Sequence, residues 1–180
     1  MDKLYNNLKM KQQLLVDMDG VLADVYSQFL RFEFEELGIK QSLKDLEGVL
    51  EMKAFANAEK YVRTKGFFRN APTIQGSVEG LKYLNDKYKV LIVSSATEFP
   101  DSLSEKLYWL NEHYPFITWE QMIFCGKKDS VKGDIMLDDH FKNLDYFEGK
   151  TVLFTQPHNA KMENGRHIRA NNWNEVVNIL

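Results

Sequence analysis

LLVDMDGVLAD, residues 14–24, is the stretch that decides the fold. A short apolar run ends in Asp17, and a second acid, Asp19, follows two residues later. The run is too apolar for a half-solvated strand, so it predicts a central strand covered on both faces. Gly20 then breaks the strand and lets the backbone turn. Both acids are therefore expected at the carboxyl end of a buried strand, where open α/β sheets bind their ligands.

The two acids also predict a cation site. Two carboxylates this close repel each other and retain protons unless a cation lies between them. Carboxylate oxygens in such a cluster suit Mg²⁺. A D-x-D string alone is more typical of a strand that ends in a solvated turn. The glycine turn and the new apolar run that follow Asp19 favour the cation site.

A second apolar run, residues 89–97, ends in the hydroxyls Ser94 and Ser95. Such hydroxyls often cap loops. They are also neutral hydrogen-bond donors, which bind a phosphoryl oxygen without adding charge. The sequence alone leaves both interpretations open.

Two further strands are expected over residues 121–125 and 134–140. Lys127 and Lys128 follow the first of them, either as a solvated turn or as a cation for the site. The second ends in the adjacent acids at 138–139. Two neighbouring carboxylates after a buried strand are costly unless they are solvated or coordinated. Polar groups are therefore expected at four successive strand ends.

The chain between the first two strands predicts a small helical insertion. An apolar face at helical spacing runs over residues 21–37, and residues 39–65 are expected to be mostly helical, with Ser42 as an N-cap. A connection this long is unusual between neighbouring strands. We expect a helical cap at residues 24–69, over a core formed by residues 1–23 and 70–180.

The segment Gly66–Pro72 reads as a turn or hinge at the end of this cap. It contains Phe67 and Phe68, which either pack the cap against the core or face the cleft between them. Helices are expected at 77–88, 101–114 and 173–180, and one more strand at 151–155. Lys106 lies on the second of these helices, where composition alone predicts a solvated position.

Composition narrows the classes of function. The formal net charge is −3 and no basic tract stands out, which argues against a nucleic-acid polymer or a membrane surface as partner. A single cysteine, Cys125, cannot form an internal disulfide and fits a reducing compartment. Residues 1–13 are polar and lack the core of a signal peptide, and no apolar stretch reaches membrane-spanning length. A cytoplasmic protein is expected.

Taken together, the ordered strand ends resemble the four motifs of the haloacid dehalogenase superfamily of phosphotransferases. Within that superfamily the chain most closely resembles the 5′(3′)-deoxyribonucleotidases. The matching stretches are DMDGVLAD at 17–24, GFFR at 66–69, EKLYW at 105–109, the acid pair at 138–139 and FTQPHN at 154–159. The resemblance implies an α/β fold with a Rossmann-like parallel sheet, helices on both faces and a small helical cap inserted after the first strand.

The resemblance also implies roles for individual residues. Asp17 would be the nucleophile that forms an aspartyl-phosphate, and Asp19 the general acid and then base. Mg²⁺ would be held by Asp17, by the Asp19 backbone carbonyl and by an acid of the pair at 138–139. The family points to Asp139 as the ligand, with Asp138 orienting it, although the sequence leaves the choice between them open.

The remaining candidates would bind the substrate, a nucleoside monophosphate. Candidates for the phosphoryl group are Ser94, Ser95, Lys106 and Lys128, and candidates for packing on the nucleobase are Phe29, Phe67 and Phe68. The chain departs from the family where residues 94–96 read Ser-Ser-Ala rather than Thr-Ser-Pro. Two alternatives remain open: a phosphatase for another small phosphomonoester such as a sugar phosphate, and a nucleotide-binding regulator without turnover. The oligomeric state is left open.

Overall fold

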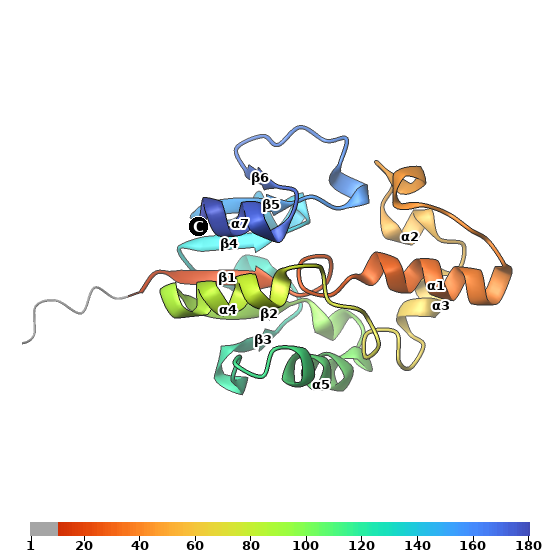
Figure 1. Ribbon diagram of the computed structural model, residues 1–180, viewed down its shortest axis with the longest axis horizontal. Helices are drawn as coiled ribbons and strands as arrows, with labels where there is room; N and C mark the ends of the chain where they lie inside the picture. Colours follow the sequence, from red (N-terminus) through yellow and green to blue (C-terminus); the bar gives the residue numbers. More distant parts are fainter. Residues whose placement is uncertain (1–10) are drawn as a thin grey trace, which may run out of the picture.

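A computed structural model describes residues 11–180, which fold around one parallel sheet (Figure 1). Its six strands run in the order β3-β2-β1-β4-β5-β6, so β1 lies near the centre, as its apolar sequence predicts. The strands are β1 Gln13–Asp17, β2 Lys89–Ser94, β3 Met122–Phe124, β4 Ile135–Asp138, β5 Lys150–Phe154 and β6 Ile168–Ala170. The predicted Rossmann-like sheet is confirmed.

Alternate residues of each strand face opposite sides of the sheet, and each side has its own core. Leu14 and Val16 belong to the larger core, whereas Leu15 belongs to the smaller. Outside the segment between β1 and β2, the larger core includes residues of α5 Ser102–His113 and α7 Trp173–Ile179, and within that segment it includes residues of α4 Ser77–Lys87 and of the helices that precede it. The short helix α6 Phe141–Leu144 contributes to the smaller core, so helices lie on both faces, as predicted.

Helices α4 and α7 lie side by side over one face of the sheet (Figure 1). Gly80 of α4 allows this contact, because a Cβ atom there would stand 2.6 Å from Cε3 of Trp173. The Trp173 side chain is buried and donates from Nε1 to the carbonyl of Val21 at 2.8 Å. This bond ties α7 to the loop that follows β1.

The segment between β1 and α4 contains helices but no named strand, and it lies beyond the arrowhead ends of the strands (Figure 1). Its elements are α1 Val25–Leu37, the 3-10 helix η1 Leu43–Leu46, α2 Glu51–Ala54 and α3 Ala58–Val62. The prediction of a mostly helical stretch over 39–65 is only partly met, because short turns separate these pieces. Ser42 does precede η1, and its N–H and hydroxyl both donate to Asp45.

Two boundaries differ from the sequence-based prediction. The first helix starts at Val25 rather than Val21, because Asp24 accepts from the backbone N–H of Ser27 and acts as its N-cap. The last strand, β6, falls between the strand expected at 151–155 and the helix expected at 173–180, where the sequence predicts no strand. Its three residues are too few to show an alternating pattern.

Four 3-10 helices complete the fold: η2 Ala96–Glu98, η3 Trp119–Gln121, η4 Lys128–Ser130 and η5 Pro157–Asn159. Within the described part of the chain, no helix combines the length and the apolar character needed to cross a bilayer. The sequence-based expectation for the first ten residues lies outside the described residues.

Candidate active site

Four strand ends and the turns that follow them form the site. Asp17 ends β1 and Asp138 ends β4, the strand beside it, and Asp139 follows directly. Carboxylate oxygens of these three acids lie within 4.8 Å of one another, and all three residues are buried. The parallel sheet brings them together, because neighbouring parallel strands end at the same edge.

Lys128 is the cation that faces this cluster. Its ammonium lies 2.6 Å from Oδ1 of Asp17 and 2.7 Å from Oδ2 of Asp138. Burial alone would lower the pKa of Lys128, but the charges of Asp138 and Asp17 outweigh it and keep the pKa above its usual value. Lys128 therefore carries a positive charge at neutral pH. The other candidate, Lys127, is exposed, as expected for a residue in a solvated turn.

The three acids do not share this cation equally. Burial would raise the pKa of Asp138, but Lys128 outweighs it and lowers the pKa. Burial, followed by the charge of Asp138, raises the pKa of Asp17 well above its usual value, and burial likewise raises that of Asp139. One lysine is thus too little positive charge for three buried carboxylates.

Lys106 joins the opposite wall of the site. Although it lies on a helix, its side chain is buried, so the solvated position expected from composition is wrong. The ammonium donates to Oδ2 of Asp19 and to the hydroxyl of Ser94, the latter at 3.1 Å, and stands 4.4 Å from the ring centroid of Phe68. Lys106 thereby connects the turn after β1 with the end of β2.

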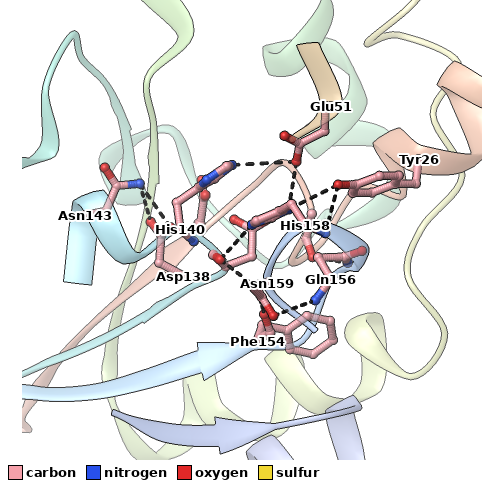
Figure 2. A network of polar contacts seen from close by, with 12 residues as sticks. Tyr26, Glu51, Asp138, His140, Asn143, Phe154, Gln156, His158 and Asn159 are labelled. Carbon is pink, nitrogen blue, oxygen red and sulfur yellow. Dashed lines mark hydrogen bonds and ion pairs between the residues drawn. The ribbon is translucent and has the colours of Figure 1, made fainter. Parts of the chain in front are cut away.

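The acid pair after β4 divides into two different environments. Asp138 accepts a hydrogen bond from Lys128. It also accepts from the backbone N–H of His140 at 2.9 Å and from Nδ2 of Asn143 at 3.0 Å (Figure 2). In residues 11–180, by contrast, nothing donates a hydrogen bond to Oδ1 of Asp139, although this atom is buried. Asp138 is thus fully bonded within the protein, and Asp139 keeps an oxygen for another ligand.

The backbone around Asp139 is held in place from two sides. Its carbonyl oxygen accepts from Nε2 of His158 at 2.9 Å and from Nδ2 of Asn159 at 2.8 Å. On the other side Gly20 turns with φ of +76°, and a Cβ atom there would overlap the Asp139 carboxylate. The absence of a side chain at Gly20, in the turn after β1, therefore makes room for the carboxylate of Asp139, which follows β4.

The donor set fits a divalent cation. Three buried carboxylates face one lysine, and Asp139 presents a buried oxygen without a protein partner in the described chain. Oxygen ligands of this kind suit Mg²⁺. A second group, formed by Glu51, Asp139, His140 and His158, also brings ligand atoms within 4.8 Å. The rings of His140 and His158 stack with an angle of 12° between their planes, so they do not converge on one ion.

A cavity of about 340 Å³ opens from the acids toward the helical segment. Nine of the predicted site residues line it: Asp17, Asp19, Asp139, Lys106, Lys128, Ser95, Phe29, Phe67 and Phe68. Ser94 and Asp138 do not line it, but each is bonded to a lysine that does. The cavity has a charged end at the sheet and an aromatic end under the helices.

The aromatic end is closely packed. Phe29 stacks on Phe55 with ring centroids 4.8 Å apart and meets the edge of Phe67 at 4.7 Å. Phe67 in turn meets Phe68 at 5.0 Å. All four side chains are buried, and all but Phe55 line the cavity, so packing and cavity lining are compatible roles here.

Several residues of the site were given no role on sequence grounds. Asn143 and Asn159 hold the acid pair, and Glu51 contacts both histidines. His140 directly follows the acids and His158 lies in the FTQPHN stretch, so position was a signal for these two. Nothing in the sequence around Glu51 distinguishes it from the other charged residues of the insertion.

Comparison with known proteins assigns the chain to a family. Residues 11–180 match the family described as 5′ nucleotidase, deoxy (pyrimidine), cytosolic type C protein (NT5C). The chain belongs to the NT5C family. Members of the NT5C family are phosphatases that hydrolyse phosphomonoesters. The match therefore confirms the predicted enzyme class and the predicted haloacid dehalogenase superfamily.

Curated relatives agree with the NT5C assignment. Two proteins named 5′(3′)-deoxyribonucleotidase, from Bacillus subtilis and from Bacillus phage SPbeta, are each 40% identical over 176 residues, covering 95% of this chain and 99% of the relative. A haloacid dehalogenase-like hydrolase from Streptococcus pneumoniae has the same fold, with a TM-score of 0.60 at 14% identity, covering 94% of this chain and 98% of the other.

Proposed function

We propose that the chain hydrolyses deoxyribonucleoside monophosphates through an aspartyl-phosphate on Asp17. The observation that carries the proposal is the cavity itself. Its charged end holds Asp17 beside Lys128, and its aromatic end has the size and chemistry for a nucleobase. The relatives named 5′(3′)-deoxyribonucleotidase support the choice of substrate.

In the first step an oxygen of Asp17 attacks phosphorus and the bond from phosphorus to the nucleoside oxygen breaks. Oδ2 of Asp19 is bonded to Lys106, whereas Oδ1 has no hydrogen-bond partner in residues 11–180, so Oδ1 is free to pass a proton to the leaving oxygen. In the second step Asp19 takes a proton from water, which attacks the aspartyl-phosphate and releases inorganic phosphate.

Three groups hold the phosphoryl oxygens during both steps. Lys128 offers its ammonium beside the nucleophile, and Lys106 offers a second from the opposite wall. The Ser94 hydroxyl, bonded to Lys106, is a neutral donor at the end of β2. Preorganised donors of this kind stabilise charge that spreads over the phosphoryl group in the transition state.

Mg²⁺ would be held by the Asp17 carboxylate, the Asp19 backbone carbonyl and the free oxygen of Asp139. When bound, it supplies positive charge that lowers the repulsion between the nucleophile and the phosphate. Asp138 would orient this set, because its own oxygens are already bonded to Lys128 and Asn143.

The helical segment would act as a cap that selects the leaving group. Its two crossings to the core meet at an antiparallel bridge between Ala23 and Thr73, close to the expected boundaries of the cap at 24–69. Phe29 and Phe68 line the cavity and keep a small exposed aromatic surface, on which a base stacks with about 1–3 kcal/mol, whereas Phe67 is wholly covered. A cytoplasmic location stays a prediction from the single cysteine.

The Asp17→Asn variant tests the chemistry. Turnover of a deoxynucleoside monophosphate with Mg²⁺ should fall at least about a thousandfold, while the thermal midpoint is retained, because the substitution removes a charge that burial disfavours. Asp129→Asn, at an exposed acid beside Lys128, is the matched control and should keep full activity. Unchanged turnover in the Asp17 variant would exclude the covalent route.

A substrate panel tests the leaving group. Deoxynucleoside 5′- and 3′-monophosphates should be hydrolysed with kcat/KM at least about tenfold above ribonucleotides or sugar phosphates of equal charge. Equal or better rates on sugar phosphates would show that the substrate is another phosphomonoester and not a deoxynucleotide. Absence of hydrolysis on every compound of the panel would favour a nucleotide-binding regulator.

A further inference from the structure

We propose that Glu51 is a positioning residue that latches the cap to the core, by an ion pair with His158 that reaches the backbone of Asp139. The proposal rests on the proposed function, because it assigns a task to the cap in that reaction. It concerns the group of Glu51, Tyr26, His140 and His158, which the chemistry above does not use.

Glu51 is the first residue of α2 and turns inward from the cap (Figure 2). Its Oε1 lies 2.9 Å from Nδ1 of His158 and 3.7 Å from Nε2 of His140, and only 14% of its side chain is exposed. Both histidines belong to the core, one after β4 and one in η5. One carboxylate of the cap therefore contacts two separate elements of the core.

The geometry favours a charged pair. A backbone carbonyl can only accept, so Nε2 of His158 must carry the hydrogen that it donates to Asp139. Nδ1 lies 2.9 Å from the Glu51 carboxylate, which repels a bare lone pair, and 3.1 Å from the hydroxyl of Tyr26, which can accept as well as donate. The carboxylate, as the nearer group, favours a hydrogen on this nitrogen too. His158 is then an imidazolium whose counter-charge comes from the cap.

The energetics of ionisation agree with this assignment. Burial would raise the pKa of Glu51, and the bond and charge of His158 outweigh it and lower the pKa to about 2. His158 therefore keeps Glu51 ionised at neutral pH.

The contact extends to both acids at the end of β4. His158 bonds to the carbonyl of Asp139, while the backbone N–H of His140 bonds to Asp138. The two imidazole rings stack with centroids 4.2 Å apart. Moving Glu51 away leaves a buried imidazolium unpaired against the carbonyl of Asp139, so closure of the cap and the geometry of this acid are coupled.

The opposite side of the cap is fastened differently. Glu105 of α5 accepts from the backbone N–H groups of Gly66 at 2.6 Å and of Arg69 at 3.1 Å, and Trp109 donates to the carbonyl of Ala71 at 2.7 Å. These neutral backbone groups are tied to one rigid helix. We therefore place the hinge at residues 66–71 and the latch, which opens, at α2.

Hydrogen exchange of the purified full chain, with no substrate present, tests the latch directly. In Glu51→Ala the backbone amides of residues 48–56 should exchange about tenfold or more faster, while those of β1 and β4 keep their rates. Glu51→Gln, which retains a hydrogen-bond acceptor, should give a smaller change. Glu47→Ala removes a half-buried carboxylate that lies 3.8 Å from the exposed ammonium of Lys161, on the same side of the cap, and should leave exchange unchanged.

Kinetics of the same variants test the coupling to Asp139. Glu51→Ala should raise both KM for the nucleotide and the Mg²⁺ concentration for half-maximal rate several-fold, and Glu47→Ala should change neither. Adding Glu51→Ala to His158→Gln should cost nothing further, because one partner is already lost. Unchanged exchange in 48–56, equally faster exchange throughout the sheet, or strictly additive effects would each overturn the latch. The exchange result stands even if no nucleotide is hydrolysed, so it separates failure of the latch from failure of the proposed function.

Discussion

Lys106 shows how one side chain links two strand ends. Replacing it by methionine keeps a long apolar side chain and removes the charge that faces Asp19, Ser94 and the ring of Phe68. Because a preorganised donor to the phosphoryl group is lost, kcat should fall about a hundredfold. Steady-state rates on a deoxynucleoside monophosphate measure this. Lys82→Met, at an exposed position of α4, should leave kcat unchanged. An equal fall of kcat in both variants would show that Lys106 has no specific role in the reaction.

Residues near strand ends were predictable, and residues that meet them from elsewhere were not. Asp17, Ser94 and Asp138 end apolar runs, and parallel pairing alone brings such ends together. Glu51 and His158 are 107 positions apart, and their pairing depends on where the cap packs. Lys106 looked solvated from composition alone, because no local pattern records which face of α5 meets the site.

At the scale of elements, α5 holds residues 66–71, the segment that leads from the cap back to the core. Glu105→Ala leaves the part-buried N–H groups of Gly66 and Arg69 without their acceptor, which should lower the free energy of unfolding by about 1–3 kcal/mol. Urea denaturation followed by circular dichroism measures the change. Glu112→Ala is the matched control, because Glu112 lies on the same helix and pairs with the Arg69 side chain in solvent. If Glu112→Ala lowers the free energy of unfolding as much as Glu105→Ala does, the hydrogen bonds from Gly66 and Arg69 to Glu105 do not stabilise the chain as proposed.

The elements that the sequence predicts well are those with enough residues to repeat a pattern. β1, β2 and β5 are buried runs of five or six residues, and α4 and α5 repeat an apolar face over several turns. The cap was predicted as a helical insertion, yet its short pieces α2 and α3 hold four and five residues. Helices this short are stabilised by tertiary packing rather than by their own sequence, so their bounds could not be predicted.

At the scale of the whole molecule, the fold gathers more negative charge than it neutralises. Asp17, Asp138 and Asp139 are buried together with Lys128 as the ammonium bonded to two of them. Bringing these carboxylates together opposes folding, and the chain tolerates it because the sheet edge and two cores fix their positions. A ligand that binds only the folded state and offsets this repulsion must stabilise the entire chain.

Mg²⁺ should therefore raise the thermal midpoint. At about one hundred times its dissociation constant it contributes about 2.7 kcal/mol, or about 5–10 °C for a domain of this size, and a chelator should reverse the shift. Asp139→Asn should lose most of the shift, because the oxygen without a protein partner is the one proposed to bind the ion. It should also melt no lower than the parent chain in chelator, since it removes a charge that burial disfavours. Asp129→Asn, with an exposed side chain, should keep the full shift; a full shift in Asp139→Asn as well would place the ion elsewhere.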